Sequence, residues 1–254
     1  MVIAGWGVDF PRVSPTKMTA MPCRERAMKG FDFAGFLSYF GNGFLWKGLL
    51  VTLWLTAIPM VLGLVLGTFI ALMRMSKSRA LENLALFYIW IFRGTPLLIQ
   101  LVIVFTGLPQ LGIRFGVVTS ALLTLTLNET AYLSEIIRSG FMGVPAGQRE
   151  AAISLGCPPW LVIWKVLLPQ AFRLMIPPLG NSVNGLLKAT SITSVISMEE
   201  LMRRSQMLMQ EKFDVLEVFS CAAVLYLMMT TVWGLIQRQL EIHFHCESVP
   251  VTEA

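Results

Sequence analysis

Residues Gly48–Met73 read GLLVTLWLTAIPMVLGLVLGTFIALM, a run that contains no charged side chain. A hydrocarbon core about 30 Å thick is crossed by roughly 20 apolar residues in a helix, so this run is long enough to span a membrane. The whole chain has 55% hydrophobic and 14% charged residues, with a mean hydropathy of +0.67. This composition leaves too little polar surface for a water-soluble globule, and it predicts a membrane protein.

Four more segments extend the pattern towards the C-terminus. The predicted spans are Leu84–Leu108, Val117–Ile137, Pro177–Ser197 and Val215–Ile236. Backbone polar groups in lipid must be hydrogen-bonded within the protein, so all five segments should be helices and the fold all-α and polytopic. The second span contains Arg93-Gly-Thr-Pro96, where proline removes a backbone donor and predicts a kink, and the fourth is expected to start at the pair Pro177-Pro178.

The predicted organisation is a transmembrane domain over residues 31–241, between a disordered tail over residues 1–30 and a C-terminal tail over residues 242–254. Aromatic residues between Phe31 and Phe44 indicate an interfacial segment before the first span. Eight basic residues lie near the spans on one side and six on the other, too small a difference to orient the chain.

Several chemistries are not expected from this sequence. The only histidines are His243 and His245, and the four cysteines are widely separated, which argues against a metal site or a disulfide framework. No GxxxxGK[ST] phosphate loop occurs, so the chain should bind neither ATP nor another cofactor and should not be an enzyme. Basic residues avoid the apolar runs without forming one patch, so nucleic acid is not an expected partner.

The loop between the third and fourth spans reads VPAGQREAAISLGCPPWLVIWKVLLPQ over residues 144–170. Gln148–Leu155 predicts a short helix in which Ala151 and Ala152 allow another protein to approach closely. Gly156 can adopt the positive φ that ends such a helix. The alternative is an ordinary amphipathic loop between two spans.

This loop resembles the Glu-Ala-Ala loop of permeases of binding-protein-dependent ABC importers, in the polar amino-acid branch. Further similar stretches are Phe92-RGTPL-Leu98, Ala131-Tyr132 with Glu135, Pro177-PLG-Asn181, and Leu187-KAT-Ser191. The resemblance extends from about Phe31 to about Glu241 and implies a type I ABC importer permease fold that carries polar amino acids or derivatives such as opines.

The resemblance also implies partners. Glu150, Ala151, Ala152 and Gly156 would form a coupling helix held by a dimer of cytoplasmic ABC ATPases, which bind the ATP. A second permease chain, identical or different, and an extracytoplasmic solute-binding protein would complete the assembly in the bilayer. The chain would cross a bacterial inner membrane with its N-terminus outside and its C-terminus in the cytoplasm.

Ionisable residues within spans are candidates for the substrate path, because charge in lipid is costly. Glu129 could hold a cationic group of the solute, form a structural ion pair with Lys188 or Arg93, or be protonated. Many members of the resembled family have aspartate where this chain has Ala189, which would alter specificity or shift that role to Glu129 or to a second permease.

Polar residues of two other spans are further candidates for this path. Arg93 and Thr95 lie at the helix break, where free backbone groups could face a carboxylate or where a plain kink could occur. Asn181, Lys188, Thr190 and Ser191 could face a cavity or form hydrogen bonds between helices.

Two other classes of membrane protein are alternatives to an importer permease. A membrane enzyme would need a nucleophile or a metal cluster within the membrane. An ion channel would transport its solute without a partner ATPase.

Overall fold

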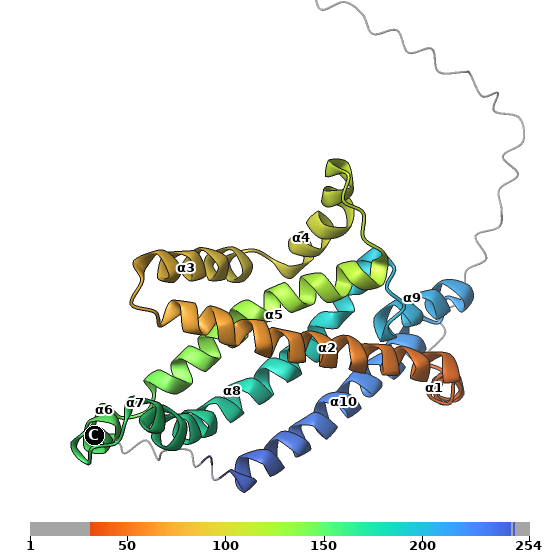
Figure 1. Cartoon of the computed structure of the whole chain (residues 1–254). Coiled ribbons are helices and arrows are strands. Elements are labelled where there is room, and N and C mark those ends of the chain that lie inside the picture. Colours follow the sequence, from red (N-terminus) through yellow and green to blue (C-terminus); the bar gives the residue numbers. More distant parts are fainter. Residues whose placement is uncertain (1–30, 245, 247–254) are drawn as a thin grey trace, which may run out of the picture. The chain divides into compact units, whose positions relative to one another are not determined.

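The computed structural model describes residues 31–244 and Cys246. This part of the chain contains helices and no strands, which confirms the all-α prediction (Figure 1). The helices are α1 (Phe33–Phe40), α2 (Gly43–Arg74), α3 (Arg79–Gly94), α4 (Leu97–Val102), η1 (Ile103–Gly107), η2 (Leu108–Leu111), α5 (Val117–Met142), α6 (Ala146–Ser154), α7 (Pro159–Leu161), η3 (Val162–Leu167), α8 (Leu168–Ala189), η4 (Thr190–Ile196), α9 (Leu201–Lys212) and α10 (Val215–His243). The predicted tail over residues 1–30 and most of that over residues 242–254 lie outside the described residues.

Three of the described helical segments are long and apolar enough to cross a membrane: Gly43–Arg74, Pro159–Ile196 and Val215–His243. The pair Arg79–Gly94 and Leu97–Leu111, bent by 101°, would make a fourth. The remaining predicted span is α5, which has 26 residues and is therefore about 39 Å long. It is not among the apolar spans, because polar residues occur along much of its length.

α5 is a polar helix surrounded by its neighbours, since it contacts α2, α3, α4 and α8. Some of its buried hydroxyl groups are bonded within the helix itself. Thr124 Oγ1 donates to the carbonyl of Ser120 at 2.8 Å, and Thr130 Oγ1 donates to that of Thr126 at 2.7 Å. These bonds lower the cost of burying the two hydroxyl groups, whereas the buried hydroxyls of Ser120 and Thr126 have no partner among the described residues.

The crossing of α2 and α5 depends on two glycines one turn apart. A Cβ atom on Gly67 would lie 3.1 Å from the backbone nitrogen of Ser134 and 3.2 Å from the carbonyl oxygen of Thr130. A Cβ atom on Gly63 would lie 3.0 Å from a methyl group of Leu133. The spacing is the GxxxG pattern that lets membrane helices approach closely.

The break in the second predicted span is larger than a proline kink. α3 ends at Gly94 and the next helix begins at Leu97, with a bend of 101° between them. Thr95 and Pro96 have extended backbone angles, as expected for a residue that precedes proline and for proline itself. The predicted location of the irregularity is confirmed.

The predicted start of the fourth span at Pro177 is wrong. The candidate span begins at Pro159, and both Pro177 and Pro178 lie inside α8. A proline at position 177 leaves the carbonyl of Arg173 without its helical N–H donor. The thiol of Cys246 donates to that carbonyl at 3.2 Å, and such replacement donors allow proline within membrane helices.

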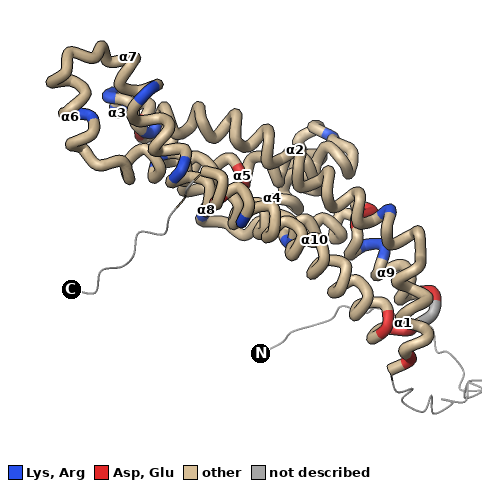
Figure 2. Tube along the Cα trace, turned by 90° about the horizontal axis from the view of Figure 1, so that it is seen from below, with Lys and Arg blue, Asp and Glu red and all other residues tan. Residues whose placement is uncertain are grey.

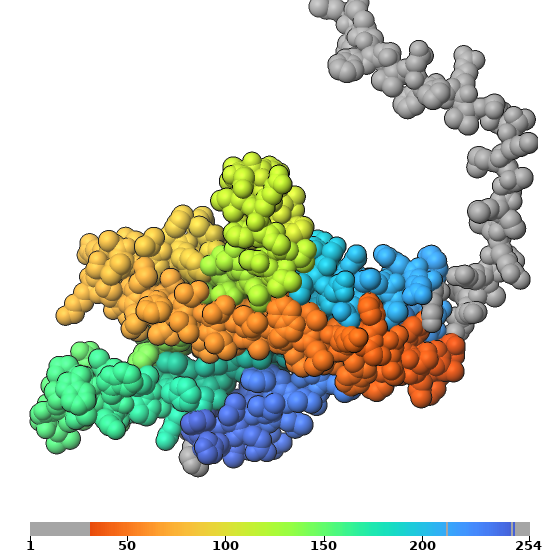
Figure 3. All heavy atoms as spheres, turned by 45° about the vertical axis from the view of Figure 1, so that its right-hand side comes forward, coloured from red at the N-terminus to blue at the C-terminus, as the bar shows by residue number. Residues whose placement is uncertain are grey.

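The helix α9 lies between the last two candidate spans, and Glu200 anchors its start. The fully buried Glu200 carboxylate accepts the N–H groups of Met202 and Arg203 at 2.9 and 2.8 Å and the hydroxyl of Tyr226 at 2.8 Å. α9 contacts α2 and α10, and Figure 3 shows it beside the beginning of α2.

Candidate functional site

The helix α6 and its C-terminal turn form the first candidate site. α6 ends in a left-handed residue, Gly156, whose φ is +76°, as predicted. The N–H of Gly156 donates to the carbonyl of Ile153 at 2.9 Å, and that of Cys157 donates to the carbonyl of Ala152 at 3.1 Å. These two bonds are the Schellman pattern, which fixes where the helix stops. The predicted short helix is confirmed. It begins two residues before the predicted Gln148 and ends one residue before the predicted Leu155.

Only part of α6 is available to another protein. Glu150 and Ala151 are exposed, whereas Ala152 is 6% exposed, so Ala152 faces the protein's own interior and not a partner. The following Leu155 is 83% exposed, more than any other large apolar side chain in the described residues. α6 and its C-cap residue Leu155 therefore leave a small residue, a carboxylate and an apolar side chain accessible.

The second candidate site is the helix break, where Arg93 and Thr95 are both exposed. The Arg93 guanidinium lies over the Tyr132 ring, 5.1 Å from its centroid. Thr95 Oγ1 donates to the carbonyl of Ile91 at 2.8 Å and accepts from Gln100 Nε2 at 2.8 Å. The polar groups at the break are therefore largely paired within the chain.

Glu129 lies on α5 and is 6% exposed. Its carboxylate accepts a hydrogen bond from the hydroxyl of Ser182 on α8, and a Cβ on Gly63 of α2 would come within 3.5 Å of the Glu129 Cβ. Among the described residues, no lysine or arginine nitrogen lies within 4.0 Å of it, so the ion pair considered with Lys188 or Arg93 does not form there. The carboxylate is enclosed where α2, α5 and α8 meet.

The polar residues of the fourth span divide into two groups. Asn181 and Lys188 are exposed on α8 and are seven residues apart, so they share one face of the helix. Thr190 is fully buried and its hydroxyl donates to the carbonyl of Leu187 at 2.8 Å, which removes it from an open cavity. Ser191 is half-buried and donates to the carbonyl of Lys188 at 2.7 Å.

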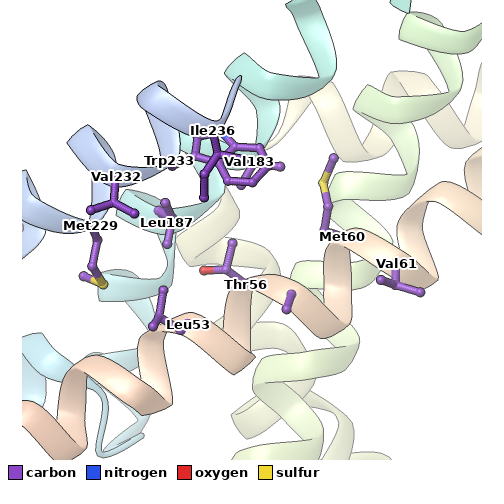
Figure 4. Close-up of a pocket in the computed structure, with 11 residues that line it drawn as sticks. Leu53, Thr56, Met60, Val61, Val183, Leu187, Met229, Val232, Trp233 and Ile236 are labelled. Atoms are coloured by element: carbon purple, nitrogen blue, oxygen red, sulfur yellow. The ribbon is translucent and has the colours of Figure 1, made fainter. Parts of the chain in front are cut away.

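A pocket of about 370 Å³ lies between α2, α8 and α10 (Figure 4). Its lining is apolar apart from Thr56, whose hydroxyl already donates to the carbonyl of Thr52 at 2.8 Å. Trp233 closes one side, and its indole N–H donates to the carbonyl of Gly180 at 2.8 Å. A wall with no free polar group does not suit a polar solute.

Several residues that shape these sites were not singled out from the sequence. Gln100 and Asn128 bond to the helix break, Ser182 bonds to Glu129, and Gly63 with Gly67 sets the α2–α5 crossing. The GxxxG spacing of the two glycines was a readable signal. Gln100 bonds to Phe92 from eight residues away, but Asn128 and Ser182 are paired across 28 to 53 residues of sequence, which local patterns do not reveal.

Comparisons with known proteins identify the family of this chain. The sequence profile of the binding-protein-dependent transport system inner membrane component family matches residues 63–243. The probable amino-acid ABC transporter permease protein YckA of Bacillus subtilis is 38% identical over 195 residues, which cover 77% of this chain and 86% of that protein. The arginine transport system permease protein ArtQ of the same organism is 37% identical, over 78% of this chain and 91% of its own length.

Solved structures show the same fold. The crystal structure of an amino acid ABC transporter with histidines superposes with a TM-score of 0.79 and 35% identity, covering 84% of this chain and 98% of that one. The MetNI methionine ABC transporter has a TM-score of 0.63 at 19% identity, a likeness of fold alone. The importer-permease fold expected from the resemblance is confirmed, and the chain belongs to the family of binding-protein-dependent transport system inner membrane components.

Proposed function

We propose that this chain is the membrane-spanning permease subunit of an ATP-driven importer for a polar amino acid or an amino-acid derivative. The observation that carries the proposal is α6, a short helix with a fixed end that exposes Glu150, Ala151 and Leu155 between two long helices. The names of the relatives, which include amino-acid and arginine permeases, support the solute class. An opine or another small nitrogenous solute is the alternative within this class.

The ATP would be bound by a partner ATPase dimer that holds α6. Within its own chain, α6 packs on η3, and η3 continues into α8. On its other side, α6 follows α5 in the sequence after a short turn. A push on α6 would therefore act on two long helices at once. This arrangement supports a role for Glu150, Ala151 and Gly156 in coupling, with Ala152 supporting the helix from beneath.

A second permease chain would cover the face of α8 that carries Asn181 and Lys188. Both side chains are exposed, although they belong to a segment long and apolar enough to cross the membrane. A charged side chain at bilayer depth costs about 3 kcal/mol or more, so this face needs a water-filled cavity or another protein. We place the solute path along this face of α8, with Ser191 beside it. Glu129 would be connected to the path by its hydrogen bond with Ser182.

The proposed orientation follows from which helix ends lie together. The rings of Phe172 and Phe244 are 5.4 Å apart, so the end of α10 lies beside the start of α8, towards α6. At the other end of α10, Asp214 accepts the hydroxyl of Tyr39 at 2.9 Å, which places α1 there. Figure 2 shows α6 and α7 at the opposite end of the helices from α1 and α9. With α6 in the cytoplasm, the C-terminus is cytoplasmic and the N-terminus outside.

Reconstitution tests the proposal. The chain should take up a labelled amino acid into liposomes only with its partner permease, the ATPase, the binding protein and ATP. Uptake that continues without the ATPase would identify a channel instead and overturn the proposal.

A further inference from the structure

The amides of Gln100 and Asn128 meet at the break between α3 and α4. Pro96 has no N–H, so the carbonyl of Phe92, four residues earlier, has no helical donor. Gln100 Nε2 donates to this carbonyl at 2.9 Å and Asn128 Nδ2 donates to it at 3.0 Å. Asn128 Nδ2 also donates to Gln100 Oε1 at 3.1 Å. One donor of the pair comes from α4 and the other from α5, so the amides bond the bend to α5.

The Gln100 amide is enclosed as well as bonded. Its side chain is 7% exposed, and its nitrogen also contacts the carbonyl and hydroxyl oxygens of Thr95 at 3.1 and 2.8 Å. A buried amide that loses its partners is strongly disfavoured, so the bend is stable in the geometry that keeps these bonds. The bend angle is therefore set by contacts from α5 as well as by Pro96.

α3 also contacts α5 away from the break. Tyr88 donates its hydroxyl to the carbonyl of Leu127 at 2.7 Å. Near the start of α3, Glu82 pairs with Arg74 at 2.8 Å, and Arg74 Nε lies 3.8 Å from Glu135 of α5. Tyr88 therefore bonds α3 to α5 directly, whereas Glu82 is connected to α5 only through Arg74, the last residue of α2.

We propose that Gln100 and Asn128 are positioning residues of the transport cycle, which make the α3–α4 bend move with α5 as one body. Because α5 leads into α6, a displacement of the coupling helix reaches the bend through α5 and this amide pair. The bend would then follow α5 without changing its angle. This role rests on the proposed importer function, whereas the mechanical connection itself belongs to the chain alone.

The connection is tested first without any partner. Spin labels at Leu84 on α3 and Leu111 on η2, both exposed, report the bend in the full chain in lipid nanodiscs, with the four native cysteines replaced. Gln100→Met and Asn128→Leu keep side-chain volume and remove the amides. The matched control is Gln170→Met, which also removes an amide bonded to a helix carbonyl, that of Val166 at 2.9 Å, far from the break.

The distance distribution between the labels should broaden in both test variants and stay narrow in the control. Losing two amide bonds should raise the population of detached bends roughly tenfold. Folded protein is confirmed in each case by gel filtration and by the yield of monodisperse chain. Unchanged narrow distributions in Gln100→Met and Asn128→Leu would overturn the connection, whatever the chain transports.

The functional part is tested in the reconstituted complex by the ratio of solute taken up to ATP hydrolysed. Gln100→Met and Asn128→Leu should keep ATP hydrolysis and lower this ratio, and the double variant should be no worse than the more impaired single one because the two amides act together. A purely structural role would lower uptake and hydrolysis in proportion to the amount of folded complex. That proportional loss, or an unchanged ratio, would contradict the positioning role.

Discussion

Replacing Gly156 by alanine should loosen the end of α6 without creating a clash. The φ of +76° is a region that costs an L-residue about 1–2 kcal/mol. A Cβ atom at this position would meet nothing within 4 Å, so the whole cost is conformational. It corresponds to a change of about 5- to 30-fold in the equilibrium between the closed and frayed helix end.

Gly147→Ala is the matched control, because it adds the same methyl group to the same helix. Gly147 lies inside α6, and its Cβ would also meet nothing within 4 Å. Alanine is the better helix former by about 0.8–1.0 kcal/mol, so this substitution should stabilise α6. Gly156→Asn should lie between Gly156→Ala and the unmodified chain, since asparagine tolerates the left-handed conformation better than alanine.

Hydrogen exchange at the Cys157 amide, which bonds to the carbonyl of Ala152, measures the opening directly. Exchange should be about 5- to 30-fold faster in Gly156→Ala and no faster in Gly147→Ala. The Kd for the partner ATPase should rise by up to the same factor, because binding requires the closed helix. Equal exchange in the two alanine variants would refute the claim that the backbone angle of Gly156 holds the coupling helix in shape.

Three further predictions concern the fold, the path and the response to pH. Gly67→Leu should abolish monodisperse protein in gel filtration, because even a Cβ would lie 3.1 Å from the α5 backbone, whereas Gly185→Leu should be tolerated since nothing lies within 4 Å of its Cβ. Glu129→Gln should change the KM of uptake, and an unchanged KM would remove this carboxyl from the path. Burial raises the pKa of Glu200, so thermal stability should fall as pH rises above the ordinary glutamate value of about 4.3, and Glu200→Gln should reduce this slope; a slope equal to that of the unmodified chain would contradict it.

The fold was predictable where one local signal decided it. Apolar runs placed the ends of α2 and α10 to within seven residues, and Gly94-Thr95-Pro96 located the break because glycine and proline act on their own backbone. The predicted start of the fourth span was wrong because the pair Pro177-Pro178 was interpreted as the beginning of a helix. A donor from Cys246, 73 residues away from Arg173, compensates for the missing N–H, and local sequence does not contain that contact.

The candidate site was predictable in the same uneven way. The positive φ of Gly156 followed from its place after a short helix. Ala151 is exposed and Ala152 is buried because of the way α6 packs on η3. The Glu-Ala-Ala sequence alone does not predict which of the two alanines is buried. The hydrogen-bond partner of Glu129 is the uncharged hydroxyl of Ser182, which is 53 residues away in the sequence. The two residues meet only because α5 and α8 pack together, and local sequence does not show this contact.

Photo-crosslinking from α6 tests the central claim most directly. A benzophenone side chain at Ala151, which is exposed, should form an adduct with the partner ATPase in intact membranes, and ATP should alter its yield. The same group at Met207 of α9, 39% exposed at the opposite end, should form none with the ATPase. An ATPase adduct from Met207 and none from Ala151 would contradict the account, because α6 would then lie on the wrong side of the membrane to receive force from ATP hydrolysis.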